Sequence, residues 1–417
     1  MRIRPGNFAA ALLLLPFPPL AAQDHSHDHA PAGRPPETLG QVVFPAGCGK
    51  AVQPKVERAV ALLHSFWYEE AEAAFGEVVA ADAGCAMGHW GQAMSVLHPL
   101  WTPPTPADAA RGLAAAERAV RASRPDTRQR DYAEAIATFW RGYDGANAFR
   151  DRLTAYETAM ERVARRHPDD AEARTFYALA LIGGGQLDAG DTTYARQRKA
   201  GAILEPLFAR SPDHPGLAHY VIHAYDSPVL ASSAVSAATR YATIAPSVPH
   251  AQHMPSHIYT RVGNWQASVA SNRRSAEAGR EFEQRLGMKG LWDQRAHAWD
   301  YLMYAYLQLG MEREARALLD TAAAVTAGVP ENSLVNDYAL AAIPARYALE
   351  RARWAEAATL RVRPAPAWRA TEGISRFARA IGAARSGNLA AARVELDSLA
   401  ALERGLGEAG GAQAYWA

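Results

Sequence analysis

The sequence has no large excess of either charge, because 44 Lys and Arg residues stand against 43 Asp and Glu residues. Basic and acidic residues are mixed along the chain. No basic tract interleaved with aromatic residues occurs, which argues against a nucleic-acid partner. No long run alternates apolar and polar residues as a half-buried strand does, whereas alanine and leucine are abundant. This composition predicts an all-α fold without a sheet.

The sequence motifs of familiar catalytic sites are also missing. There is no G-x-S-x-G nucleophile elbow, no P-loop and no dinucleotide-binding glycine pattern. The run Gly183-Gly184-Gly185 precedes Gln-Leu-Asp and is typical of a flexible turn. We therefore predict no catalytic residue and no enzymatic activity.

Long apolar runs are absent beyond the N-terminal segment, so no membrane span is predicted. The first residues have the pattern of a secretory signal, with Arg2 and Arg4, an apolar stretch over 8–20 and small residues at Ala21-Ala22. This stretch is short and proline-rich, and no cysteine follows it to accept a lipid. The sequence predicts a signal peptide over 1–22 and a soluble mature protein that is periplasmic or secreted.

Cysteine is scarce, with only Cys48 and Cys85 in the chain. An exported protein meets an oxidising compartment, which favours a disulfide between them. Cys48 lies just before the first expected helix and Cys85 at the start of the third. Because an up-down helix pair returns the chain close to its origin, we predict that these two residues are bridged. The alternative is a pair of buried free thiols.

The segment after the signal peptide is rich in Pro, His and Asp, and we expect residues 23–50 to form a disordered arm. If cleavage follows Ala22, the mature chain begins Gln23-Asp24-His25. A free amine with histidine in third position suits square-planar Cu(II) or Ni(II). The arm is therefore a candidate for metal capture, with a soluble histidine-rich linker as the alternative.

Residues 51–403 contain a repeating pattern of paired helices. The first pair has Tyr68, Ala71 and Phe75 at the spacing of a tetratricopeptide hairpin, in which the small alanine lets two helices approach closely. Similar patterns recur later in the chain, with glycines at the expected helix ends. We predict an α-solenoid of tetratricopeptide-like hairpins with a right-handed superhelix. The Gly-rich residues 404–417 are expected to form a weakly ordered tail.

Several segments share unusual motifs in one order: L-L-H-S-F-W-Y-E-E-A, M-G-H-W-G-Q-A-M-S, H-P-G-L-A-H-Y-V-I-H-A-Y-D, H-A-Q-H-M-P-S-H-I-Y-T-R-V-G and R-A-H-A-W-D-Y-L-M-Y-A-Y-L-Q-L-G. They resemble a family of exported bacterial tetratricopeptide-repeat proteins. The resemblance covers roughly Val42 to Arg316, and the last hundred residues resemble only generic repeats. The sequence has His89 where the family has Tyr. The resemblance implies this fold and export, and it implies no particular reaction.

The histidines are concentrated in the expected first helices of the hairpins, whereas the clearest second helices contain none. In a tetratricopeptide stack the first helices line the concave face. We therefore predict a polar and aromatic groove that takes a peptide, a protein or a small polar ligand. The residues expected to line it are His64, His89, Trp90, His219, Tyr220, His223, Asp226, His253, His257, His297 and Asp300.

The same histidines are also candidates for a transition-metal site, with Zn or Cu as the possible ions and a metal-dependent hydrolase as a more distant alternative. His219 and His223 are four residues apart, as are His253 and His257, so each pair shares one helix face. Asp226 or Asp300 would bind the metal or fix an imidazole tautomer. Pro255 counts against the second pair. A third interpretation assigns the histidines to structural hydrogen bonds, with His214 and His250 at turns.

Overall fold

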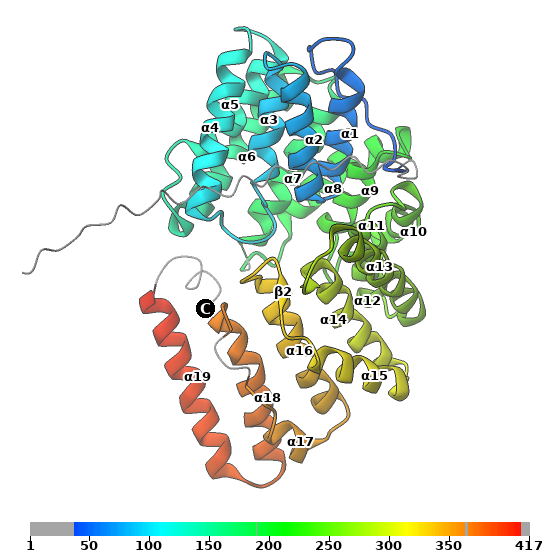
Figure 1. Cartoon of the computed structure of the whole chain (residues 1–417), viewed down its shortest axis with the longest axis vertical. Helices are drawn as coiled ribbons and strands as arrows, with labels where there is room; N and C mark the ends of the chain where they lie inside the picture. The colour runs from blue at the N-terminus through cyan, green and yellow to red at the C-terminus, as the bar shows by residue number, and fades with distance from the viewer. Residues whose placement is uncertain (1–36, 189, 363–365, 410–417) are drawn as a thin grey trace, which may run out of the picture. The chain divides into compact units, whose positions relative to one another are not determined.

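The computed structural model describes residues 37–188, 190–362 and 366–409. These residues are mainly helical, which confirms the predicted all-α class (Figure 1). The helices in chain order are α1 Gln53–His64, α2 Tyr68–Ala81, α3 Ala86–Ser95, α4 Pro106–Ala122, α5 Arg128–Trp140, α6 Phe149–Arg166, α7 Ala171–Gln186, α8 Ala195–Arg210, α9 Pro215–Ala224, α10 Val235–Ile244, α11 Pro249–His253, α12 Pro255–Arg261, α13 Trp265–Leu286, α14 Asp293–Gln308, α15 Glu312–Ala323, α16 Leu334–Glu350, α17 Trp354–Ala358, α18 Glu372–Arg385 and α19 Leu389–Ala409. Short 3-10 turns η1 Ala146–Ala148, η2 Ala231–Ala234 and η3 Arg369–Thr371 separate some of them.

Most helices pack against the next helix in the chain, as in α1 with α2, α13 with α14 and α18 with α19. Local signals set their ends. Thr105 and Asp108 form a reciprocal capping box at the start of α4. Gly263 and Gly310 adopt the left-handed conformation after α12 and α14, which glycine accepts without steric cost. These glycines end the helices where the repeat pattern predicted.

Two short strands were not predicted. β1 (Leu291–Trp292) pairs in parallel with β2 (Gly328–Val329), immediately before α14 and shortly before α16. Asn336 in α16 donates from its side-chain amide to the carbonyls of Leu291 and Val329. The pairing therefore fixes the start of α14, the helix that carries His297.

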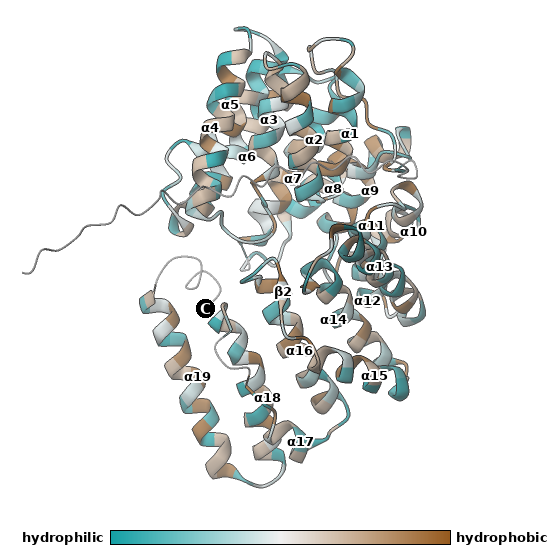
Figure 2. Cartoon of the chain, in the orientation of Figure 1, coloured by the Kyte–Doolittle hydropathy of each residue, from teal (hydrophilic) through white to brown (hydrophobic). Residues whose placement is uncertain are grey.

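The apolar side chains form two buried clusters among the described residues. The larger one runs from Leu39 to Trp292, and the smaller one joins α14, α15 and α16. Hydropathy alternates around many helices, with apolar residues on one side and polar residues on the other (Figure 2). This amphipathic pattern explains why the helices assemble, since each buries its apolar face on its neighbours.

Residues 38–50 pack into the core, so the predicted limit of the disordered arm at residue 50 is wrong for this part. Phe44 is fully buried, and its ring stacks on Trp90 with centroids 5.3 Å apart. The amide of Gln41 also donates to the carbonyl of Asp213 at 2.9 Å. The apolar residues of this segment bury enough surface to order it. At the other end α19 continues to Ala409 because Leu402 and Leu406 are buried, so the predicted tail begins too early.

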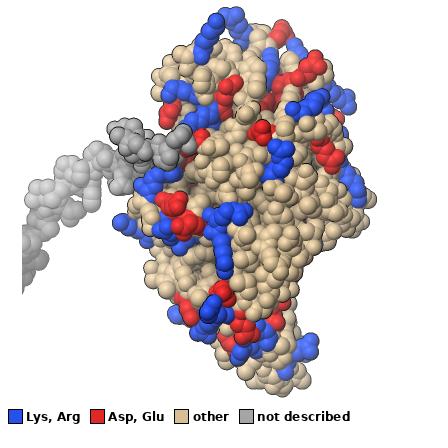
Figure 3. Space-filling view, turned by 90° about the vertical axis from the view of Figure 1, so that its right-hand side faces the viewer, with Lys and Arg blue, Asp and Glu red and all other residues tan. Residues whose placement is uncertain are grey.

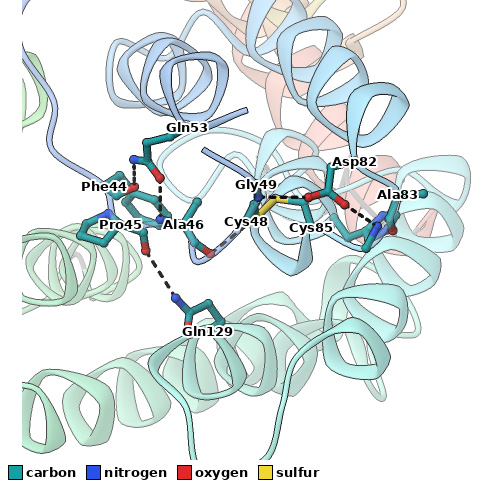
Figure 4. Close-up of a disulfide and its surroundings, with 12 residues drawn as sticks. Phe44, Pro45, Ala46, Cys48, Gly49, Gln53, Asp82, Ala83, Cys85 and Gln129 are labelled. Atoms are coloured by element: carbon teal, nitrogen blue, oxygen red, sulfur yellow. Dashed lines mark hydrogen bonds between the residues drawn. A yellow bond between two sulfur atoms is a disulfide. The ribbon is translucent and has the colours of Figure 1, made fainter. Parts of the chain in front are cut away.

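The predicted disulfide between Cys48 and Cys85 is present (Figure 4). Around it, the side-chain amide of Gln53 donates to the carbonyl of Phe44 at 2.7 Å. The carboxylate of Asp82 accepts from the backbone amides of Gly49 and Gly84. The bridge closes a loop of 37 residues, which on the chain-entropy account stabilises the fold by about 3–4 kcal/mol. It ties the segment before α1 to the start of α3.

On the face shown in Figure 3, basic and acidic side chains are interspersed and gather into no patch of a single sign. This agrees with the balanced composition. Among residues 37–188, 190–362 and 366–409, every helix is too short or too polar to cross a bilayer.

Candidate functional site: a buried histidine centre

Six histidines from α9, α11, α12 and α14 converge in two groups of three. The inner triad is His219, His223 and His250, and the outer triad is His253, His257 and His297. Within each triad the candidate ligand atoms all lie within 4.8 Å of one another. The triads adjoin, because the rings of His250 and His253 are 6.1 Å apart and those of His223 and His257 are 6.3 Å apart.

The outer triad has its imidazole tautomers set by acceptors behind the rings. Nδ1 of His253 donates to Oδ1 of Asn272 at 2.6 Å, and Nδ1 of His257 donates to Oδ2 of Asp226 at 2.7 Å. The amide of Asn272 is itself oriented, since its nitrogen donates to the carbonyl of Ser268. A neutral imidazole protonated at Nδ1 has its lone pair at Nε2. The two Nε2 atoms nevertheless face each other at 2.9 Å.

The inner triad repeats this arrangement. Nδ1 of His219 donates to the backbone carbonyl of His64 at 2.7 Å, and Nδ1 of His250 donates to Oε1 of Gln294 at 3.2 Å. Their Nε2 atoms lie 3.2 Å apart. Nε2 of His223 is buried and has no hydrogen-bond partner among the described residues. The lone pairs of His219 and His250 therefore face each other beside the ring of His223.

Burial also determines the electrostatics of the centre. Burial, together with a smaller contribution from nearby His257, lowers the pKa of His223 to about 3 and that of His297 to about 3. Burial raises the pKa of Asp226, but the adjacent His257 and Arg261 outweigh it and hold that pKa well below its ordinary value. Burial therefore favours neutral rings at His223 and His297, and the carboxylate behind His257 is ionised.

Pro255 does not separate the second histidine pair, contrary to the objection raised from the sequence. Met254 is helical, with φ −54° and ψ −35°, so α11 leads almost directly into α12. Pro255 takes the first position of α12, where its missing amide hydrogen costs no helical bond. His253 and His257 therefore share one face, and their rings meet.

A third histidine group is held by a carboxylate. Nε2 of His64 lies 2.9 Å from Oε2 of Glu172 in α7, and Nε2 of His214 lies 2.9 Å from Oε1 of the same carboxylate. Nδ1 of His214 accepts from the amide of Leu217, and Nδ1 of His64 lies 3.1 Å from the hydroxyl of Tyr220. Every ring nitrogen here has a partner, so His214 caps α9 as predicted and the group is structural.

Close contact between α1 and α9 makes this group possible. A Cβ atom on Gly216 would lie 2.5 Å from Nδ1 of His64, so only glycine fits there. Burial raises the pKa of Glu172, but the imidazoles of His64 and His214 outweigh it and hold that pKa well below its ordinary value. The ionised carboxylate therefore stays inside the core, accepting two hydrogen bonds.

The predicted open groove does not match the burial of its residues. His64, His219 and Tyr220 are 0% exposed, and His253 and Trp90 are 1% exposed. The repeat pattern places these residues on first helices, but α1, α9 and α11 pack against other helices there and exclude solvent. The remaining predicted lining residues differ in role. His89 hydrogen-bonds to the carbonyl of Ala83, and Asp300 pairs with Arg346. His25, predicted as a metal ligand of the N-terminal arm, lies outside the described residues.

A cavity of about 560 Å³ opens beside the outer triad and includes part of the predicted lining. It lies among α12, α14, α16 and α18 and is bounded by His257, Thr260, Arg261, His297, Asp300, Tyr301, Tyr304, Leu334, Val335, Tyr338, Arg346, Ala370, Thr371 and Ile374. The outer triad is thus the part of the centre that a small molecule can reach.

Sequence reasoning missed His250, which it assigned to a turn, and the acceptors Asn272 and Gln294. The only available signal for His250 was its spacing of three residues from His253. Asn272 and Gln294 belong to α13 and α14 and have no distinguishing pattern. Their roles depend on packing between helices distant in the sequence.

No protein-family profile matches the chain, and no curated protein is significantly similar to it. Loose likenesses to solved helical structures exist. The human IFIT1 dimer with PPP-AAAA is 15% identical with a TM-score of 0.44, over 84% of this chain and 72% of that one. A monomeric IFIT1 mutant with Gppp-AAAA gives 16% and 0.45, over 84% and 71%. The P58(IPK) TPR domain gives 12% and 0.20, over 85% and 98%. These values are too low to bear on function.

Proposed function

We propose that the protein binds transition-metal ions at the buried histidine centre, one at the outer triad and one at the inner triad. The observation that carries this proposal is the contact between His253 and His257. Their Nδ1 atoms are both committed to acceptors, so their Nε2 lone pairs face each other at 2.9 Å. Two lone pairs at this distance repel each other unless a cation lies between them.

The dimensions suit a metal ion. Two nitrogens bound at about 2.0–2.1 Å to one tetrahedral ion lie about 3.3 Å apart. The facing Nε2 atoms are 2.9 Å apart in the outer triad and 3.2 Å apart in the inner triad. Neutral imidazoles are ligands for Zn, Cu, Fe and Ni. Three protein ligands leave the fourth tetrahedral position open, as in zinc sites that bind water or substrate.

The groups behind the rings also support metal binding. Histidine ligands commonly donate their other ring N–H to a carboxylate or a carbonyl, which orients the ring and makes it a better ligand. Asp226, Asn272, Gln294 and the carbonyl of His64 take this role in the centre. Asp226 is thus a tautomer-fixing residue, which was one of its two predicted roles.

A shared proton is the competing occupant of each facing pair. It would create one imidazolium inside the core and make a single hydrogen bond. A metal ion instead bonds to two or three nitrogens and so offsets its dehydration. In the inner triad, the described contacts include no carboxylate that would stabilise an imidazolium, since its Nδ1 acceptors are a carbonyl and an amide. At the inner triad, this favours the metal over the proton.

We further propose that the protein acts outside the reducing cytoplasm, in the periplasm or as a secreted protein. The disulfide between Cys48 and Cys85 supports this, since such bonds persist mainly in oxidising compartments.

Elemental analysis tests metal binding. Full-length protein is loaded with Zn(II), desalted and analysed, in a background where His25, His27 and His29 are alanine so that the N-terminal segment contributes no imidazole. We expect about two ions per chain. His297→Gln should remove about one ion, because it deletes one of the three ligands of the outer triad. The side chain of His297 makes no hydrogen bond among those described, so the substitution breaks no other contact of that kind. His89→Gln is the control and should retain both. Less than stoichiometric metal in the parent, or undiminished metal in His297→Gln, contradicts the proposal.

A further inference from the structure

The cavity beside the outer triad has a floor of ligand histidines and walls of aromatic and aliphatic residues. His257 and His297 lie on its α12 and α14 side, and Tyr304, Tyr338, Leu334, Val335 and Ile374 contribute apolar surface. A volume of about 560 Å³ is within the range of small-molecule sites and too small for a folded partner. We propose that this cavity binds a small organic anion with an aromatic or aliphatic body, whose anionic oxygen takes the open position on the outer-triad metal.

Charge balance supports an anion. The charged side chains that line or border the cavity already form neutral pairs. Arg346 contacts Asp300 at 2.8 Å, and Arg261 contacts Asp226 at 2.9 Å. Three neutral imidazoles add no charge, so a divalent ion there has no full counter-charge. Burying an uncompensated charge is costly, and an anionic ligand arriving through the cavity removes that cost. This step rests on the proposed metal binding.

Tyr301, whose ring lies beside the outer triad, does not supply the anionic oxygen to the metal. Its ring is 4.7 Å from the ring of His257 and 4.9 Å from that of His253. Its hydroxyl, however, lies 3.2 Å from Nδ1 of His257, on the side of the ring opposite Nε2. The hydroxyl therefore adjoins Asp226 rather than the metal position, and it does not occupy the fourth position.

The inner triad differs from the outer one in access. Its histidines are not part of the cavity lining. His219 and His250 are 0% and 4% exposed. The organic anion is thus assigned to the outer triad alone.

Cobalt spectroscopy tests the proposal with benzoate as the probe. The full-length protein is loaded with Co(II), its cobalt content is measured, and its visible spectrum is followed during titration with benzoate and, as the neutral analogue, benzamide. We expect a saturable change of the cobalt bands with benzoate and at least tenfold weaker binding of benzamide.

A cavity-filling variant locates the ligand. Val335→Trp, in the first turn of α16, should weaken benzoate binding at least tenfold while cobalt content stays unchanged. Val235→Trp is the matched control, since Val235 lies at the start of α10 and is 40% exposed. It should bind benzoate as the parent does.

The outcomes separate the two proposals. Absence of bound cobalt contradicts metal binding itself. Stoichiometric cobalt with a spectrum that benzoate leaves unchanged overturns the organic-anion proposal alone. Equal benzoate affinity in Val335→Trp and the parent also overturns it, because the ligand then binds elsewhere.

Discussion

Two buried histidine groups in this protein differ in what faces their nitrogens. In the first, Glu172 accepts from His64 and His214, and Tyr220 and a backbone amide complete the network. In the outer triad, Asp226 and Asn272 occupy the outer nitrogens, and the inner nitrogens of His253 and His257 face each other. The position of the acceptor relative to the rings thus distinguishes the structural group from the proposed metal centre.

Glu172→Gln should have the largest effect on stability. The amide removes the charge and turns a hydrogen-bond donor toward one imidazole N–H, leaving a buried donor unpaired. We expect a loss on the order of 3 kcal/mol in the free energy of unfolding, measured by urea denaturation of metal-free protein. Bound metal per folded chain should stay the same. Loss of metal without loss of stability would reverse the roles assigned to the two groups.

His297→Gln should show the opposite pattern. Its side chain makes no hydrogen bond among those described, so the metal-free variant should unfold within about 1 kcal/mol of the parent. Its outer-site affinity for Zn(II) should fall more than about 100-fold, since one of three ligands is gone. Loss of a group that only hydrogen-bonds to a metal ligand already costs about 10–100-fold. Competition with a chromophoric chelator measures the affinity. An unchanged affinity would exclude His297 as a ligand.

Asp226→Asn tests the group behind the ring. The amide oxygen still accepts from Nδ1 of His257, but the negative charge is lost, so Zn(II) affinity should fall about 10–100-fold. Asp213→Asn is the control, because Asp213 pairs with Arg240 at the surface. If both variants bind Zn(II) equally well, the carboxylate has no part in the centre.

Asp293 offers a third case, a partly buried carboxylate that has no imidazole partner among the described residues. Burial, reinforced by the charge of Glu69, raises its pKa to about 7. Because the folded-state pKa exceeds the unfolded value, Asp293 lowers stability as pH rises from about 4 through 7. Asp293→Asn should abolish that loss and be the more stable protein at pH 8, by about 1–3 kcal/mol. Thermal unfolding of metal-free protein at pH 5 and pH 8 measures this difference, and identical pH dependence in both proteins would contradict it.

Helix boundaries were largely predictable from the sequence. The repeat pattern placed glycines at helix ends, and Gly263 and Gly310 follow α12 and α14 as expected. Glycines and prolines mark these ends through local conformational preferences, which depend only on neighbouring residues. The disulfide was predictable for a related reason, since a helix pair returns the chain to its starting point.

The histidine centre was only partly predictable. The pairs His219 with His223 and His253 with His257 are visible as i, i+4 spacings on single helices. The contribution of His250 and His297, and the burial of the set, depend on how α9, α11 and α14 pack. In an idealised tetratricopeptide repeat, the first helices face solvent on the concave side. The prediction of an open groove assumed this exposure, and it was incorrect for that reason.

Anomalous diffraction from Zn(II)-soaked crystals tests the central claim most directly, because it distinguishes the two kinds of histidine group in one experiment. The account predicts a zinc peak about 2.0–2.1 Å from Nε2 of His253 and His257, with His297 as third ligand, and a second peak at His219, His223 and His250. It predicts no peak at His64, Glu172 and His214. Zinc at the Glu172 group, or facing Nε2 atoms with no zinc between them, would contradict it.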